Sequence, residues 1–162
     1  MEARLQALED RVHIEQLLMR YAAALNTRDA DLYVSLFAPD GEFEIRLGHD
    51  EPYLGPLKGH DAIRKRWFPD GGSAVDATGR RAFGPMRHIT TNYEIDVRGD
   101  TATVRGYFLE LVSNGRNVPA GTKPPRIHSM GRYEDELVKR NGQWLFKKRL
   151  VLADFNTAWA PP

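Results

Sequence analysis

Apolar side chains recur every three to four residues through the first 25 positions of the chain. This spacing places them on one side of a long helix, which we expect to end near Asn26. Asp29 can cap a second helix over residues 29–37, which Pro39 stops. The apolar stripe consists of Leu5, Leu8, Val12, Leu17, Leu18, Tyr21, Ala22 and Leu25. The pattern therefore predicts a helical hairpin at the start of the chain.

The next part of the chain mixes short elements with glycine and proline. Residues 42–46 are typical of a short strand, and a Gly/Pro-broken loop is expected after them. Residues 59–68 are predicted to form a third helix, terminated by Pro69. Residues 70–85 contain four glycines and no hydrophobic period, so a long loop is expected there.

From residue 86 onward, polar and apolar residues alternate and β-branched residues are frequent. Residues 87–97 and 101–112 are predicted to form one hairpin, and residues 127–140 and 143–155 a second, closed by an Asn-Gly turn. Helices followed by antiparallel strands predict an α+β fold whose helices cover one face of the sheet. A length of 162 residues fits a single domain over residues 1–162.

The charge and composition of the chain limit the kinds of partner that we expect it to bind. The chain carries 23 basic and 22 acidic side chains and no cysteine, so it offers no field for nucleic acid or an anionic membrane and no thiolate chemistry. No apolar run is long enough for a signal or a membrane span. No phosphate-binding loop, dinucleotide fingerprint or metal-ligand spacing occurs. We therefore expect a cytoplasmic protein with a neutral small-molecule partner and without cofactor, metal, nucleic-acid or membrane partner.

Six segments follow one another along the chain: IEQLLMRYAAALNTRDADLYVSLFAPDGEF, GHDAIRKRW, RHITTN, GDTATVRGYF, GRYEDELVKRNGQWLF and KKRLV. In this order they resemble the SnoaL-like family of the nuclear transport factor 2-like superfamily. The resemblance covers residues 12–152. It implies a cone formed by a curled antiparallel sheet wrapped by about three N-terminal helices, with an apolar pocket. It also implies a homodimer or higher homo-oligomer, paired through the exposed outer face of the sheet.

Members of this superfamily include ketosteroid isomerase, scytalone dehydratase, bile-acid 7α-dehydratase, hexachlorocyclohexane dehydrochlorinase, polyketide cyclases and non-catalytic dioxygenase β subunits. Because one fold hosts several reactions, the resemblance implies the fold more directly than the activity.

His88 is the first candidate for chemistry. It lies in RHITTN, which resembles the strand opening that carries the catalytic histidine of the dehydrochlorinase and of scytalone dehydratase. A period of two places His88, Thr90 and Asn92 on one strand face and Ile89 and Tyr93, with Ile95 and Val97, on the other. A histidine can take a proton from carbon and return it to a leaving group. A solvent-facing polar strand face, shared with Glu94 and Asp96, is the alternative.

Asn26 stands where these relatives keep a catalytic aspartate. An amide can orient an imidazole ring but supplies no negative charge. The position of the isomerase base corresponds to Ile45, which excludes that mechanism. The resemblance therefore implies a pocket histidine whose usual acidic partner is missing.

Two further residues are candidates for the reaction. Glu110 lies near the second catalytic aspartate of the bile-acid enzyme, and alternation puts it on the face of Val104, Gly106 and Phe108, where a carboxylate is unusual unless paired. It is a candidate to orient His88 or to act as base, or it is a strand-end glutamate turned to water. Tyr21 corresponds to a tyrosine that donates to a substrate oxygen in relatives, or it is an ordinary core residue.

Five residues are candidates for substrate binding: Asn92, His128, Arg149, Trp67 and Phe108. His128 opens the third long strand, where scytalone dehydratase has histidines. Arg149 offers a fixed positive charge for an anionic group on a substrate. The bland alternatives are a hydrogen-bonded structural histidine, a solvated arginine and core aromatics.

Two functional hypotheses follow. The first is a cofactor-independent lyase of the dehydratase type, or an isomerase, that abstracts a proton from a hydrophobic cyclic or aromatic substrate. In it His88 is general base and acid, Glu110 or Asn26 orients His88, and Tyr21 donates to a substrate oxygen. The second is a non-catalytic ligand-binding or subunit-like protein of the same fold, favoured by Asn26 and Ile45 in place of acids.

Overall fold

The computed structural model describes residues 1–48, 50–69, 71, 86–113 and 125–157. The elements in chain order are α1 (Glu2–Thr27), α2 (Ala30–Ser35), β1 (Phe37–Leu47), β2 (Glu51–Lys58), α3 (Gly59–Trp67), β3 (Met86–Arg98), β4 (Thr101–Val112), β5 (Arg126–Arg140) and β6 (Gln143–Asn156). The α+β class is confirmed. The predicted loop over residues 70–85 lies, apart from Gly71, outside the described residues, as does most of the loop before β5.

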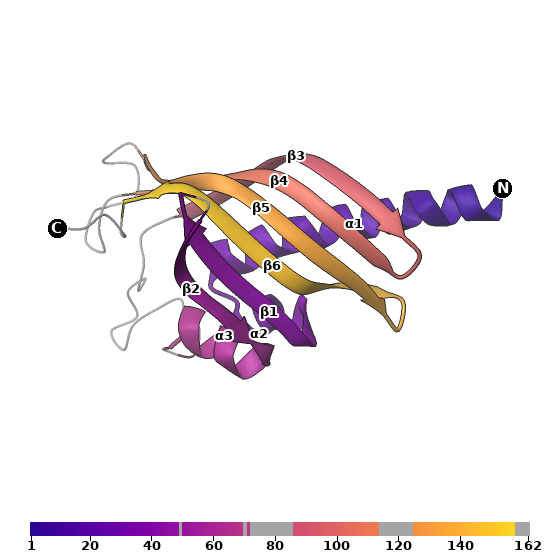
Figure 1. Cartoon of the computed structure of the whole chain (residues 1–162), viewed down its shortest axis with the longest axis horizontal. Helices are drawn as coiled ribbons and strands as arrows, with labels where there is room; N and C mark the ends of the chain where they lie inside the picture. The colour runs from indigo at the N-terminus through magenta and orange to yellow at the C-terminus, as the bar shows by residue number, and fades with distance from the viewer. Residues whose placement is uncertain (49, 70, 72–85, 114–124, 158–162) are drawn as a thin grey trace.

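The strands form one curled sheet in the order β2-β1-β6-β5-β4-β3 (Figure 1). All neighbours are antiparallel except β1 and β6, which run parallel. The expectation of an antiparallel sheet is therefore wrong at this pair. The reason is topological: β1 and β6 are far apart in the sequence and are not joined by a tight turn, so they are free to pair in parallel.

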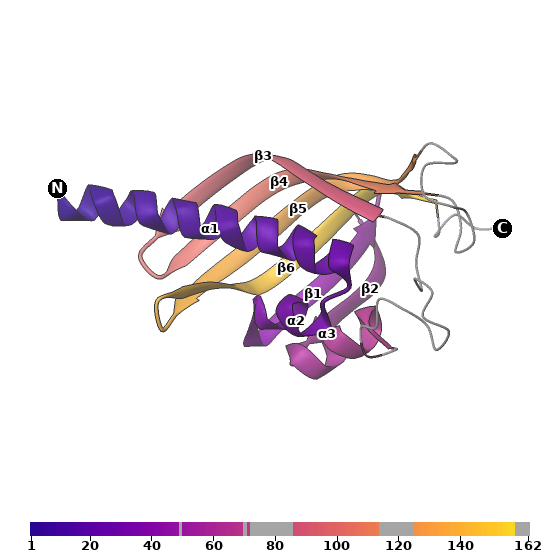
Figure 2. The same ribbon diagram turned by 180° about the vertical axis from the view of Figure 1, so that it is seen from behind.

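Helix α1 crosses the concave face of the sheet, and α2 and α3 lie together beside β1 (Figure 2). The predicted apolar stripe is buried at Leu17, Leu18 and Tyr21, but Leu5 and Leu8 are 57% and 63% exposed. The stripe is only partly buried because the start of α1 extends past the edge of the sheet. The carboxylate of Asp29 accepts a hydrogen bond from the backbone N–H of Leu32, so the predicted cap of α2 is confirmed.

The region before α3 contains a strand that the sequence interpretation missed. Residues predicted as a loop form β2, which pairs with β1 at the edge of the sheet. An edge strand tolerates Pro52 and Pro56 because one side of it needs no hydrogen-bond donors. Gly55 has a φ of 92°, and a Cβ there would lie 2.5 Å from the carbonyl oxygen of Phe43, so only glycine lets β2 approach β1. Strand β1 also begins at Phe37, earlier than predicted.

Strand β3 changes face in its middle. Asn92 has a φ of 56°, and the pairing of β3 with β4 shifts between Thr91 and Glu94, the signature of a β-bulge. As a result Tyr93 faces the helices together with His88, while Ile89 is 46% exposed on the outer face. The predicted assignment of Ile89, Tyr93, Ile95 and Val97 to one face, opposite His88, is wrong for this reason.

Aromatic side chains fill most of the space between the helices and the sheet. Their ring centroids lie 4.7 to 6.4 Å apart, in tilted, edge-on and stacked pairs, which are the favourable geometries for aromatic contacts. These residues are Tyr21, Tyr33, Phe37, Phe43, Phe68, Phe108, Tyr133 and Phe146. A rigid aromatic core therefore supports the side chains that surround the cavity described below.

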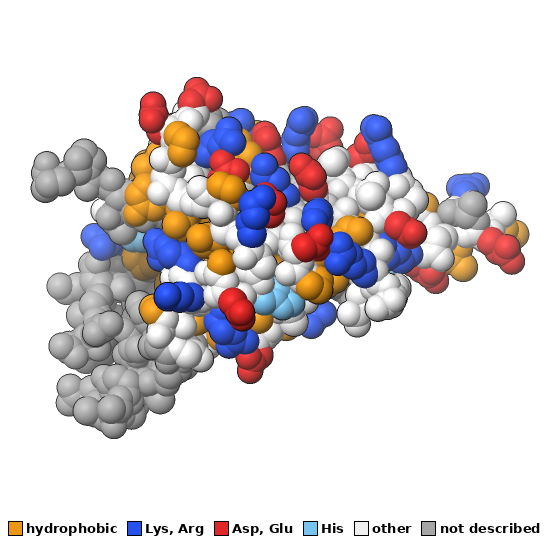
Figure 3. Space-filling model, turned by 60° about the horizontal axis from the view of Figure 1, so that its bottom comes forward, with side chains coloured by type: hydrophobic (Ala, Val, Ile, Leu, Met, Phe, Trp, Pro, Cys, Tyr) orange, Lys and Arg blue, Asp and Glu red, His pale blue; other side chains and the backbone are white. Residues whose placement is uncertain are grey.

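Acidic and basic side chains alternate over the face shown in Figure 3, without a single-sign patch. This mixture agrees with the net charge of +1. Among the described residues, no helix is both long and apolar enough to cross a bilayer.

Candidate functional site

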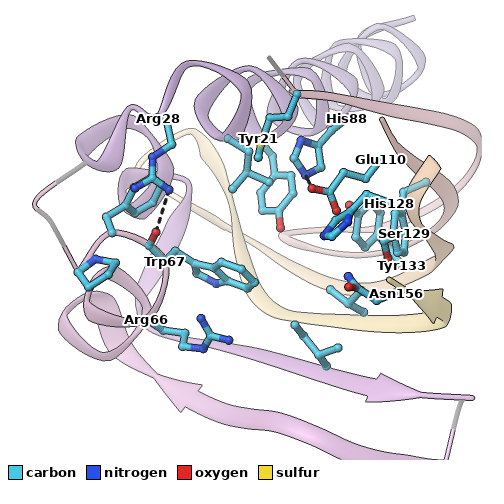
Figure 4. Close-up of a pocket in the computed structure, with 17 residues that line it drawn as sticks. Tyr21, Arg28, Arg66, Trp67, His88, Glu110, His128, Ser129, Tyr133 and Asn156 are labelled. Carbon is cyan, nitrogen blue, oxygen red and sulfur yellow. Dashed lines mark hydrogen bonds and ion pairs between the residues drawn. The ribbon is translucent and has the colours of Figure 1, made fainter. Parts of the chain in front are cut away.

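A cavity of about 570 Å³ lies between the end of α1, the end of α3 and the concave face of the sheet (Figure 4). This volume is in the range of small-molecule sites. Its wall is formed by Tyr21, Leu25, Arg28, Ile45, Arg66, Trp67, Phe68, Pro69, Met86, His88, Phe108, Glu110, His128, Ser129, Tyr133, Val151 and Asn156. Most of these side chains are apolar or aromatic. The polar ones lie on two sides: His88, Glu110, His128, Ser129 and Asn156 on β3 to β6, and Arg28 and Arg66 at the ends of α1 and α3.

Asn26 holds His88 through two hydrogen bonds. The side-chain oxygen Oδ1 of Asn26 accepts from the backbone N–H of His88 at 2.9 Å and lies 2.9 Å from Nδ1 of the ring. Since the backbone N–H can only donate, the Asn26 atom between them is the acceptor, and Nδ1 must carry a hydrogen. Nε2 is then unprotonated in the neutral ring. The structure thus gives Asn26 the orienting position and fixes the tautomer of His88.

The environment of His88 keeps its ring neutral. The side chain is only 11% exposed. Burial, followed by the positive charge of Arg149 and by the neighbouring His128, lowers the pKa of His88 to about 4. Burial disfavours the charged imidazolium, and the neutral amide of Asn26 does not compensate. At neutral pH, Nε2 is therefore a free acceptor for a proton.

Glu110 is an acidic neighbour of His88 in the cavity. The two residues are directly opposite each other on β3 and β4, and Oε1 of Glu110 lies 4.0 Å from Nε2 of His88. Burial raises the pKa of Glu110 to about 7, so neutral and ionised forms coexist near neutral pH. Alternation correctly placed Glu110 on the inner face with Phe108.

Tyr21 lines the cavity from α1 and is buried. Its hydroxyl accepts a hydrogen bond of 3.3 Å from the hydroxyl of Tyr33, which leaves its own hydrogen available to another acceptor. Burial raises the pKa of Tyr21, although the charge of Arg149 opposes this. The phenol is therefore a neutral donor at physiological pH.

Three of the predicted substrate-binding residues, Trp67, Phe108 and His128, line the cavity. Nδ1 of His128 lies 2.7 Å from the hydroxyl oxygen of Thr157. Four polar residues of the wall were missed by the sequence interpretation: Arg28 and Arg66 at the helix ends, and Ser129 and Asn156 on the sheet. Ser129 and Asn156 are opposite each other on β5 and β6 and both are buried. Strict alternation along β5 would have found Ser129, but the position of Asn156 depends on the pairing of the two strands.

The other two predicted substrate-binding residues, Asn92 and Arg149, do not line the cavity. Asn92 is exposed at the bulge of β3. The Arg149 guanidinium lies 3.8 Å from the ring centres of both Tyr21 and Tyr133, and one of its nitrogens is 3.3 Å from a carboxylate oxygen of Asp135. Arg149 is 1% exposed. Arg149 therefore does not contact the cavity directly. It affects the site through its positive charge and through its contact with the ring of Tyr21.

Within the part of the chain that the structure describes, no three His, Asp or Glu side chains are close enough together to hold a metal ion.

A curled sheet wrapped by helices is the fold of a solved nuclear transport factor 2-like protein from Novosphingobium aromaticivorans, which is 23% identical with a TM-score of 0.74 and covers 97% of this chain and 90% of that one. The chain belongs to the SnoaL-like domain family, whose model matches residues 6–150. The uncharacterized protein Rv2910c of Mycobacterium tuberculosis is 27% identical over 143 residues, which cover 88% of this chain and 84% of the relative.

Solved structures show the same fold. A variant of Rv3472, a protein of unknown function from Mycobacterium tuberculosis, is 25% identical with a TM-score of 0.71 and covers 94% of this chain and 76% of that one. A candidate scytalone dehydratase from Novosphingobium aromaticivorans is 24% identical, with a TM-score of 0.68 and coverages of 96% and 91%. LinA is 22% identical, with a TM-score of 0.70 and coverages of 98% and 99%.

Proposed function

We propose that this protein is a small-molecule lyase of the dehydratase type, which removes a proton from carbon in a hydrophobic cyclic or aromatic substrate. The observation that carries the proposal is that three side chains with suitable chemistry line the same cavity. A ring nitrogen without a proton, a carboxyl group with a pKa of about 7 and a phenol donor line one cavity, from His88, Glu110 and Tyr21. A lyase of this type needs these three functions.

The proposed reaction starts with neutral His88 and neutral Glu110. Nε2 of His88 accepts the proton from the substrate carbon, and the electrons of the broken C–H bond form the new double bond. The carboxyl of Glu110 donates its proton to the leaving hydroxyl, which departs as water. The products are the alkene, water, a charged imidazolium and a carboxylate.

The two side chains can then reset each other. The imidazolium of His88 and the carboxylate of Glu110 are direct neighbours on adjacent strands, 4.0 Å apart. Because the folded environment raises the pKa of Glu110 to about 7 and lowers that of His88 to about 4, the proton returns from Nε2 to the carboxylate. Tyr21 would stabilise the charge that develops on a substrate oxygen during the first step.

The test is turnover in a panel of cyclic and aromatic alcohols that carry a carbonyl next to the acidic C–H. We expect His88→Gln and Glu110→Gln each to lower kcat by a factor of about 10² to 10⁴, the usual contribution of general acid–base catalysis. His13→Gln and Glu94→Gln are matched controls because both side chains are exposed.

Unchanged turnover in His88→Gln would show this assignment to be wrong. Binding of the same compounds without any turnover would support the second hypothesis, a non-catalytic ligand-binding protein. The replacement of an acid by Asn26 favours that alternative, because an amide leaves His88 a weaker base than a carboxylate would.

A further inference from the structure

The cavity has a second polar end that the proposed proton transfers do not use. Arg66 and Trp67, at the end of α3, lie across the cavity from His88 and Glu110 (Figure 4). The Arg66 guanidinium lies 5.1 Å from the centre of the Trp67 ring. Arg28 donates a hydrogen bond of 3.3 Å to the backbone oxygen of Trp67, which ties the end of α1 to this side of the cavity.

Trp67 carries an unsatisfied donor at this end. Its Nε1 is buried, and no described residue accepts a hydrogen bond from it. A buried N–H donor that is left unpaired lowers the stability of the protein, because it has lost its hydrogen bond to water without gaining another. The ring is held in place by an edge-on contact with Phe43, at 5.3 Å between ring centres. A ligand acceptor that reached this wall would satisfy the donor.

Among the described residues, Arg66 has no acidic partner. No carboxylate of the described residues forms an ion pair with it, whereas the neighbouring Arg64 is paired with Asp31. A guanidinium presents parallel N–H donors in one plane, which match the two oxygens of a carboxylate. Stacking on Trp67 limits the side-chain freedom that would be lost on binding.

From these observations we propose that the substrate is a ring-containing molecule with a carboxylate remote from the reacting carbon, held by Arg66 and Trp67. This inference rests on the proposed function only in taking the cavity as the substrate site. The aromatic walls receive the ring, His88 and Glu110 face the reacting carbon, and the carboxylate stays at the end of α3. The two ends of the cavity would then orient the substrate: Arg66 and Trp67 bind its carboxylate, and His88 and Glu110 contact its reacting carbon.

The experiment compares the binding of a naphthoate with that of the corresponding uncharged naphthamide by titration calorimetry. We expect the wild-type protein to bind the naphthoate about tenfold more tightly, the usual gain from a charge-assisted hydrogen bond. In Arg66→Gln this preference disappears. Lys65→Gln keeps it, because Lys65 carries the same charge on the same helical turn without lining the cavity.

Equal affinity of the wild-type protein for the two compounds would overturn the inference, and so would equal losses in Arg66→Gln and Lys65→Gln. The measurement involves no turnover. If His88→Gln retains the preference for the naphthoate and shows unchanged catalysis, the proposed lyase is wrong and the carboxylate site stands. If His88→Gln loses catalysis and the wild type shows no preference for the naphthoate, the proposed lyase is supported and the carboxylate site is wrong.

Discussion

The oxygen of Asn26 accepts from both the backbone and the ring of His88. A single atom therefore sets the ring orientation, the tautomer and the position of the strand opening relative to α1. The same atom carries no full charge, so it does not stabilise the imidazolium. Orientation and charge stabilisation, which an aspartate would combine, are separated in this protein.

Asn26→Asp is expected to restore the missing charge. A carboxylate can accept the same two hydrogen bonds, and its charge beside Nδ1 should raise the pKa of His88 by about 1 or more. The measurement is an NMR titration of the ring protons. Asn141→Asp, which adds the same charge in the turn between β5 and β6, should leave the His88 titration unchanged. An unchanged titration in Asn26→Asp would contradict the described hydrogen bonds.

The pH dependence of catalysis follows from the pKa values of His88 and Glu110. The proposed active form has neutral His88 and neutral Glu110. It is lost below a pH of about 4, where His88 gains a proton, and above a pH of about 7, where Glu110 loses one. We expect a bell-shaped profile of kcat/KM between these limits. Glu110→Gln should remove the alkaline limb from any residual activity, and a profile that keeps rising above pH 8 would count against Glu110 as the acid.

At the scale of elements, the bulge in β3 decides which side chains reach the interior. Before Asn92 the inward residues are His88 and Thr90, and after it they are Tyr93 and its alternating successors. The hydroxyl of Tyr93 donates a hydrogen bond to that of Thr90 across the bulge. The bulge thus lets one strand present a polar site at its start and apolar packing at its end.

Replacing Asn92 tests this role. Its positive φ is tolerated by asparagine and glycine but is costly for a β-branched residue. We expect Asn92→Val to lower the free energy of unfolding by about 1 to 2 kcal/mol, measured by denaturant titration. Asn92→Gly should change it little. Similar effects of the two substitutions would mean that the left-handed conformation at this position is not required.

At the scale of the whole molecule, the outer face of the sheet carries a continuous apolar row. Ile89, Leu109, Met130 and Phe155 are successive cross-strand partners on β3, β4, β5 and β6. Ile89, Met130 and Phe155 are exposed. Two further exposed apolar side chains lie on the strands of the row, Tyr107 on β4 and Ile127 on β5. A contiguous apolar patch of this kind is typical of an association surface.

The predicted homo-oligomer would bury this row. We expect a light-scattering mass of at least a dimer at micromolar concentration, and Met130→Glu should shift the protein to a monomer because it places a charge in the centre of the row. Thr103→Glu adds the same charge at an exposed position of β4 outside the row and should leave the mass unchanged. A monomeric wild-type protein would contradict the prediction.

The features that depend on local periodicity could be predicted from the amino-acid sequence alone. Spacing along α1 placed Tyr21 on its buried side, the cap at Asp29 started α2, and alternation put Glu110 with Phe108 on the inner face. These features require only the geometry of one helix or one strand, which the residues within it specify. Family resemblance added His88 as the group to consider first.

Features that depend on contacts between distant segments could not be predicted from the sequence and became visible only in the folded chain. Whether Asn26 or Glu110 orients His88 was open, and only the packing of α1 on β3 assigns this role to Asn26. The parallel pairing of β1 with β6 and the burial of Arg149 behind Tyr21 are decided in the same way. The pattern of polar and apolar residues indicates which face of a helix or strand a residue occupies. It does not indicate which distant segment packs against that face.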